Sequence, residues 1–112
     1  MRFFKELTMS PGERHLNEGL ADYDDGDFKA ASKELQSALD QGLNPKQQAE
    51  AHKYLAFMHC SSRQQWECRN QFRQAFGADP QFQLGAAEVG NPIWGPIYRS
   101  VKLEPANKTR LR

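Results

Sequence analysis

Apolar residues recur along most of this chain with the period of an α-helix. Leu16, Leu20 and Tyr23 fall at positions i, i+4 and i+7, which places them on one side of a helix. No run of alternating apolar and polar residues is flanked by hairpin turns, so the pattern predicts no strand. The sequence therefore predicts an all-α protein, with helices over 11–25, 27–41, 45–61, 63–77 and 92–103 and an irregular stretch up to about residue 90.

Local signals mark where these helices begin and end. Ser10-Pro11-Gly12-Glu13 has the composition of a capping box, in which Ser10 and Glu13 satisfy each other's backbone amides. Pro11 fits the first helical position, where its missing N–H costs nothing. Similar starts are expected at Asn44-Pro45-Lys46-Gln47, Ser62-Arg63-Gln64-Gln65 and Asn91-Pro92, and the expected stops are Gly26, Gly42 and Gly77.

The segment 17–39 carries the first copy of a longer pattern. It joins two predicted helices through a Gly26-Asp27-Phe28 turn. This segment resembles a tetratricopeptide repeat (TPR), a pair of helices in about 34 residues. The family places small residues where helices cross closely and one large residue in the second helix, and these positions are matched by Gly19, Ala31, Ala38 and Leu35.

A second copy of the pattern runs from Ala49 to Pro80. Cys68 lies 37 residues after Ala31, and the three extra residues fit in the Gly42–Asn44 connection, where an insertion costs little. The second turn departs from the family's pattern, because Arg63-Gln64-Gln65 replaces Gly-Asp-aromatic. The resemblance implies a short α-solenoid with repeats at about 11–43 and 45–80, and the other matching positions are Leu55, Ala56, Phe72 and Ala75.

The predicted last helix, 92–103, has an apolar side. Ile93, Ile97 and Val101 share it, and Trp94 lies beside them. We expect Trp94 and Ile97 to be buried against the helix at 63–77. The last helix would then cap the second repeat.

These elements imply one domain followed by a tail. The two repeats and a capping segment over 81–103 give a single domain over 1–103, and residues 104–112 are predicted to be a disordered basic tail. Charge is segregated along the chain, with a formal charge of −4 over residues 1–27 and +4 over residues 99–112.

Composition narrows the class of protein. Fifteen Lys and Arg balance fourteen Asp and Glu, a formal net charge of +1, so nucleic acid is not expected as a partner. A mean hydropathy of −0.82 argues against a membrane-spanning helix. Lys5 and Glu6 interrupt the stretch where a signal peptide would be apolar, which predicts a cytoplasmic protein. The alternative is a periplasmic or lipid-anchored protein whose leader is missing from this sequence.

No group of residues has the spacing of a catalytic or metal site. If Gly26 is placed at the sixth position of a calcium loop, its first and third ligands would be Ala21 and Tyr23, so the acidic run 22–27 is expected to be a solvated helix end. His52 and His59 lie seven residues apart and lack the closer ligand pairs of a zinc site. We expect no enzyme activity, no cofactor, no metal and no small-molecule substrate.

The two cysteines leave an alternative open. Cys60 and Cys68 lie on either side of the turn at Gln64, four residues from it in each direction. In an antiparallel helix pair this spacing places them roughly opposite each other, so a disulfide is geometrically feasible. A reducing cytosol would leave two packed thiols, whereas an exported protein would have the disulfide.

The TPR resemblance also implies a function. Proteins of this family hold a peptide against a concave face lined by the first helix of each repeat. The sequence therefore predicts a non-enzymatic adaptor that binds a peptide or partner protein, and the alternative is a self-associating subunit that forms a homodimer through the same face. The residues mapped onto this face are Asn17, Leu20, Tyr23, Asp24, Lys53, Tyr54, Phe57 and Ser61, with Cys60 beside them.

A looser similarity points to a biological setting. The stretch from His52 to Phe57, the two cysteines and the stretch from Asn91 to Tyr98 are similar to small bacterial TPR lipoproteins associated with type VI secretion. This resemblance implies a scaffold or accessory role in a bacterial secretion or cell-envelope assembly. It also implies a periplasmic location and an oxidised pair of cysteines.

Overall fold

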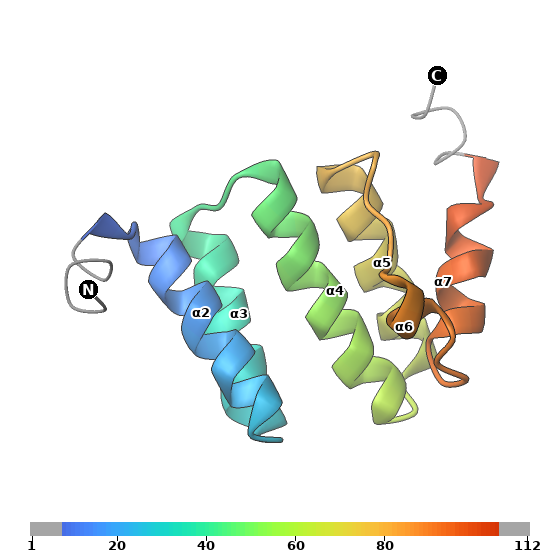
Figure 1. The fold of residues 1–112 in the computed structure, drawn as a ribbon, viewed down its shortest axis with the longest axis horizontal. Helices are drawn as coiled ribbons and strands as arrows, with labels where there is room; N and C mark the ends of the chain where they lie inside the picture. Colours follow the sequence, from blue (N-terminus) through green and yellow to red (C-terminus); the bar gives the residue numbers. More distant parts are fainter. Residues whose placement is uncertain (1–7, 106–112) are drawn as a thin grey trace. The chain divides into compact units, whose positions relative to one another are not determined.

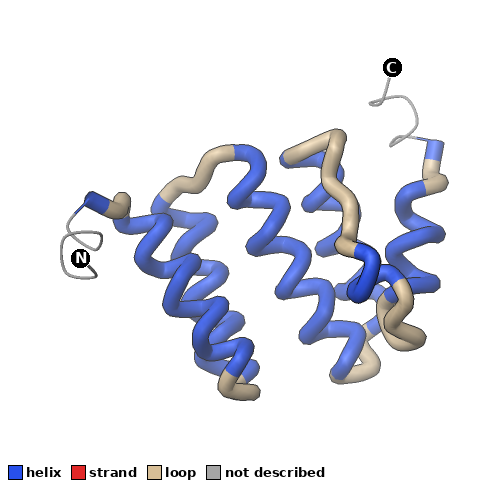
Figure 2. The backbone as a smooth tube through the Cα atoms, in the orientation of Figure 1, coloured by secondary structure: helices blue, strands red, loops and turns tan. Residues whose placement is uncertain are grey.

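The computed structural model describes residues 8–105, and every regular element within this range is a helix (Figures 1 and 2). The predicted all-α class is therefore confirmed. The chain divides into two compact units, Met1–Asn44 and Pro45–Arg112. The first contains α2 (Pro11–Asp24) and α3 (Phe28–Gln41), and the second contains α4 (Pro45–Ser61), α5 (Gln65–Ala78), α6 (Ala86–Val89) and α7 (Gly95–Lys102). The single domain expected over 1–103 stays a prediction, as does the tail, of which residues 106–112 lie outside the described range.

The first unit is an antiparallel hairpin of α2 and α3 (Figure 1). The predicted capping box is present, since the Glu13 amide donates to Ser10 Oγ over 3.2 Å and the Ser10 amide donates to Glu13 Oε1 over 3.1 Å. Gly26 adopts a φ of 79°, a left-handed conformation that favours glycine and turns the chain after α2. The Asp27 carboxylate then accepts from the Ala30 amide and caps α3.

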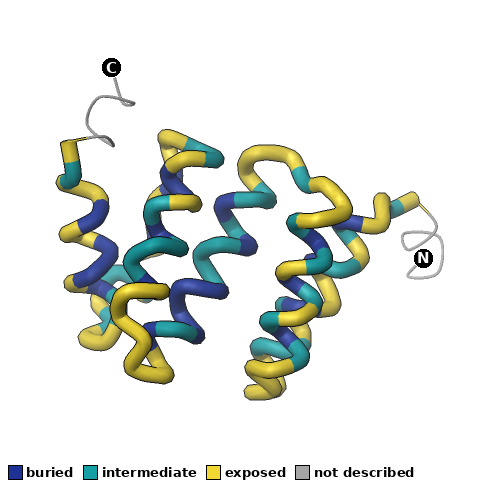
Figure 3. Tube along the Cα trace, turned by 180° about the vertical axis from the view of Figure 1, so that it is seen from behind, coloured by how far each residue is buried: buried dark blue, intermediate teal, exposed yellow. Residues whose placement is uncertain are grey.

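The two helices of this unit pack closely because small residues lie at their contact. Leu35, Ala31 and Ala38 have no exposed surface. Gly19 lies directly over Leu35, and a Cβ at Gly19 would lie 2.8 Å from the Leu35 Cγ atom. Buried positions accordingly recur at intervals of three or four residues along α2 and α3, and Figure 3 shows the buried and exposed positions along the chain.

The second unit begins with an antiparallel hairpin of α4 and α5, and α7 packs on α5. Arg69 bonds to Ser100 and Arg73 bonds to Glu104, so residue numbers rise in the same direction along both helices. The helix α7 is therefore parallel to α5. This direction is possible because residues 79–94, which we call the strap, lead from the end of α5 back toward the level of its start before α7 begins (Figure 1).

Three predicted helix ends are wrong. The helix α5 begins at Gln65 rather than 63, because Arg63 adopts a left-handed φ of 62° in the preceding turn and Ser62 cannot start a helix there. Gly77 lies inside α5, which continues to Ala78. The last helix begins at Gly95 rather than 92, and residues 92–94 form a turn in which Asn91 Oδ1 accepts from the amides of Ile93 and Trp94.

The stretch expected to be irregular contains a short helix, α6. It begins after Gly85, whose amide donates to Glu88 Oε1 over 2.9 Å. Beyond it, Ile93 lies in a turn and is 51% exposed, so the expectation that it shares the buried side with Ile97 and Val101 is wrong.

Candidate functional site

The four residues mapped onto α2 follow one another along the helix, with Leu20 three residues after Asn17, and Tyr23 and Asp24 three and four residues after Leu20. Asn17 and Asp24 are exposed, and Leu20 and Tyr23 are half-buried. Tyr23 stacks on Phe28 of α3 with ring centroids 5.4 Å apart. Asn17 Nδ2 donates to the Met9 sulfur over 2.9 Å. This part of α2 therefore presents two exposed polar groups beside two partly exposed apolar side chains.

The corresponding residues of α4 have a different environment. Phe57 is only 2% exposed, because Trp94 of the strap stacks on its ring with centroids 4.0 Å apart and an interplanar angle of 18°. Lys53 Nζ lies 3.0 Å from Glu88 Oε2, in an ion pair with the strap. Phe57 therefore does not lie on an open face, which corrects the sequence-based assignment. Tyr54 is half-buried and only Ser61 is exposed.

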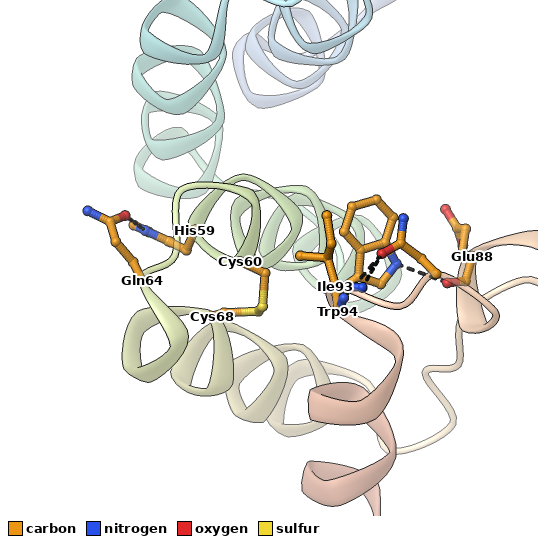
Figure 4. The surroundings of a disulfide bond; sticks show 8 residues. His59, Cys60, Gln64, Cys68, Glu88, Ile93 and Trp94 are labelled. Atoms are coloured by element: carbon orange, nitrogen blue, oxygen red, sulfur yellow. Dashed lines mark hydrogen bonds between the residues drawn. A yellow bond between two sulfur atoms is a disulfide. The ribbon is translucent and has the colours of Figure 1, made fainter.

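The strap is tied to α4 through a connected set of contacts, and Figure 4 shows the hydrogen bond within the strap that joins Trp94 to Glu88. Trp94 Nε1 donates to the Glu88 carbonyl over 2.9 Å, so the ring that covers Phe57 and the carboxylate that pairs with Lys53 are joined to each other. Arg99 donates to the Val89 carbonyl. Gly95 lies so close to that same carbonyl that a Cβ would clash with it. The strap is consequently a packed part of the second unit.

Trp94 of the capping segment therefore packs against a different helix from the one expected. Trp94 packs on Phe57 of α4 rather than on α5. The side chain that fills the α5–α7 contact is Tyr98, which is 3% exposed and lies against Phe72 and Phe76. Its hydroxyl accepts from the Leu84 amide over 3.2 Å, which ties this part of the strap to α7.

Cys60 of α4 and Cys68 of α5 form a disulfide (Figure 4). Their Cα atoms are 5.2 Å apart, and the two residues are 4% and 0% exposed. Of the two alternatives left open by the sequence, the structure therefore contains the oxidised pair.

Two histidines occupy equivalent places in the two hairpins. His15 Nδ1 lies 2.8 Å from Glu34 Oε2, and His52 Nδ1 lies 2.7 Å from Gln71 Oε1. Within each pair the two residues are 19 positions apart in the sequence, and the second pair lies 37 positions after the first. Burial lowers the pKa of His52 and outweighs its hydrogen bond to Gln71, which favours the charged form.

The remaining histidine and the acidic run have local structural roles. His59 Nδ1 lies 2.6 Å from Gln64 Oε1 across the α4–α5 turn. Partial loss of water and the negative charges of Asp27, Glu34 and Asp25 raise the pKa of Asp22. Within residues 8–105, no three His, Cys, Asp or Glu side chains converge on one point.

A shallow pocket of about 450 Å³ lies beside the strap. It is formed by the first half of α4 and the start of the strap, and both signs of charge line it. The lining residues are Lys46, Ala49, Glu50, Lys53, Asp79, Gln81, Phe82 and Gln83.

Over the described range, none of the helices combines the length and the apolar character needed to cross a bilayer. Comparisons with protein-family models, with curated proteins and with solved structures found no match to this chain.

Proposed function

We propose that this chain is a non-enzymatic protein-interaction module of the TPR type. Its two helix-turn-helix repeats span about 11–43 and 45–80, and residues 81–103 cap the second. This proposal rests mainly on one observation: buried positions of the first hairpin recur 37 residues later in the second hairpin. The equivalent positions are completely buried in both hairpins: Ala31 and Cys68, Leu35 and Phe72, and Ala38 and Ala75. The two histidine pairs are separated by the same 37 residues.

Binding of a peptide or partner protein then falls mainly to α2. Its residues Asn17, Leu20, Tyr23 and Asp24 combine hydrogen-bonding groups with apolar anchors, as recognition of an extended or helical peptide requires. On α4, Lys53 and Phe57 are engaged by the strap, so the contribution of that helix is limited to Tyr54 and Ser61.

The disulfide supports a setting for this adaptor. Buried disulfides persist in oxidising compartments and are rare in a reducing cytosol. The Cys60–Cys68 bond therefore favours the periplasmic alternative over the cytoplasmic one. A scaffold or accessory role in a bacterial secretion or cell-envelope assembly agrees with this location.

A quantitative pull-down from cells that make this protein tests the proposal. The double variant Asn17→Ala/Asp24→Ala should lower recovery of the bound partner by about fivefold or more, the loss of a binding hot spot. Lys33→Ala/Gln36→Ala, which changes two exposed residues of α3, is the matched control and should recover the wild-type amount. Equal recovery by both folded variants would contradict a binding role for α2.

A further inference from the structure

The most exposed aromatic side chain in the described chain is Trp66, near the start of α5. Its exposed fraction is 66%, whereas Trp94 is half-buried on Phe57. An exposed tryptophan costs solvation free energy in the isolated chain, and tryptophan and arginine are the residues most enriched at binding hot spots. Trp66 is therefore the apolar centre of a candidate docking surface outside the α2 face.

The surroundings of Trp66 are held in place by the fold. The Arg73 guanidinium carbon lies 5.6 Å from the centre of the Trp66 ring, within the range of a cation–π contact. Arg73 is itself fixed, because it donates two hydrogen bonds of 2.9 Å to the Glu104 carboxylate and one to Asn70 Oδ1. The disulfide at Cys68 fixes the backbone two residues further on. A rigid surface loses little conformational entropy when a partner binds.

This surface is aromatic and carries a small excess of positive charge, because Arg63, Arg69 and Arg73 outnumber the neighbouring Glu67 and Glu104, of which Glu104 is paired with Arg73. Trp66, Arg69 and Arg73 follow each other along one side of α5 at intervals of three or four residues, and Arg63 lies exposed in the preceding turn. A partner complementary to the Trp66 surface therefore carries acidic groups next to an apolar or aromatic side chain.

The first unit of the same protein presents those features. Residues 8–44 contain eight Asp and Glu against three Lys and Arg, a formal charge of −5. At the α2–α3 turn, the acidic residues flank a stacked aromatic pair, Tyr23 and Phe28, and Phe28 is 36% exposed. Asp25 and Asp27 beside this pair are exposed.

We propose that the Trp66 surface of one copy docks on the acidic, aromatic α2–α3 turn of a second copy. The two surfaces are different parts of the chain, so the contact is head-to-tail and the resulting pair retains one unused surface of each kind. Charge complementarity and two exposed aromatic groups favour this occupant. The contact shares Tyr23 with the proposed concave face, but it joins two different surfaces, unlike the homodimer through that face, and it does not require the proposed adaptor function.

Analytical ultracentrifugation over about 1 μM to 1 mM protein tests the proposal, with each sample measured at about 50 mM and 500 mM NaCl. We expect association that increases with concentration and weakens at high salt. Trp66→Ala should raise the dissociation constant about tenfold or more. Ile93→Ala, which removes another half-exposed apolar side chain, is the matched control and should leave it unchanged.

A mixing experiment distinguishes a head-to-tail contact from a symmetric one. Trp66→Ala disables one surface and Asp25→Lys disables the other, so each variant alone should associate weakly. An equimolar mixture should form a one-to-one complex, because each variant supplies the surface that the other has lost. A monomer over the whole range at low salt would overturn the proposal, and so would a mixture that associates no better than its components.

Discussion

Single residues set how closely the helices approach. At Gly19 there is no room for a side chain, because a Cβ would lie 2.8 Å from the Leu35 Cγ atom and Leu35 is completely buried. The equivalent position 37 residues later is Ala56, which is also completely buried. The second hairpin therefore accommodates one methyl group where the first accommodates none.

Gly19→Ala should lower the free energy of unfolding by up to about 2 kcal/mol. Overpacking a tight contact costs about 1–3 kcal/mol, and the higher helix propensity of alanine offsets about 1 kcal/mol of it. Urea denaturation measures the difference. At Gly90 the nearest atom to an added Cβ is 4.0 Å away, so Gly90→Ala is the control and should change little. A stabilised Gly19→Ala protein would mean that the helices are further apart than the structure has them.

His52 makes the stability of the second unit depend on pH. Burial holds the pKa of His52 below its usual value near 6.5, so the unfolded chain takes up a proton at a higher pH than the folded one. The stability contribution is present above pH 6.5 and is lost as the pH falls through the folded pKa. We expect His52→Gln to flatten the fall in melting temperature between pH 7 and pH 5. An unchanged slope would refute this role.

At the scale of elements, sequence signals that act within one turn predicted where helices begin. Contacts between residues distant in the sequence were not predicted. The start of α2 and the start of α4 followed from Ser10, Glu13 and Pro45, whose effects act within one turn. The Lys53–Glu88 pair joins residues 35 apart, and the Trp94–Phe57 stack joins residues similarly distant. Neither has a local pattern, which is why the covered face of α4 could not be predicted.

The strap contributes to stability mainly through Trp94. Trp94→Ala removes the ring stacked on Phe57 and the hydrogen bond to the Glu88 carbonyl, and we expect a loss of about 2–4 kcal/mol. Ile93→Ala changes the neighbouring but half-exposed side chain and should cost less than about 1 kcal/mol. Thermal denaturation of the two variants gives the comparison, and equal losses would mean that the strap is not packed on α4.

The disulfide stabilises the α4–α5 hairpin. It closes a loop with a sequence separation of 8, for which the loss of chain entropy in the unfolded state corresponds to about 2–3 kcal/mol. Reduction should lower the free energy of unfolding by this amount, and Cys60→Ala/Cys68→Ala should be insensitive to reductant. A wild-type protein equally stable with and without reductant would contradict a stabilising bond.

At the scale of the whole molecule, the two helical hairpins have buried residues at equivalent positions but present different side chains at their surfaces. The buried residues of the first hairpin match those found 37 residues later in the second, whereas the surface residues do not match. The strap covers Phe57 on α4, and α2 retains the exposed Asn17 and Asp24. The matching interior positions were visible in the sequence because small and large residues recur there in the same order. Which surface stays open depends on the strap, which has no counterpart in the repeat pattern.

Site-specific photo-crosslinking in living cells tests the proposed adaptor function most directly. A photoreactive amino acid replaces Asn17 on α2 or, as the control, Gln36 on α3, both of which are exposed. The adaptor function predicts a covalent adduct with a different protein from position 17 and none from position 36. Adducts only with other copies of this chain, or equal adducts from both positions, would contradict it.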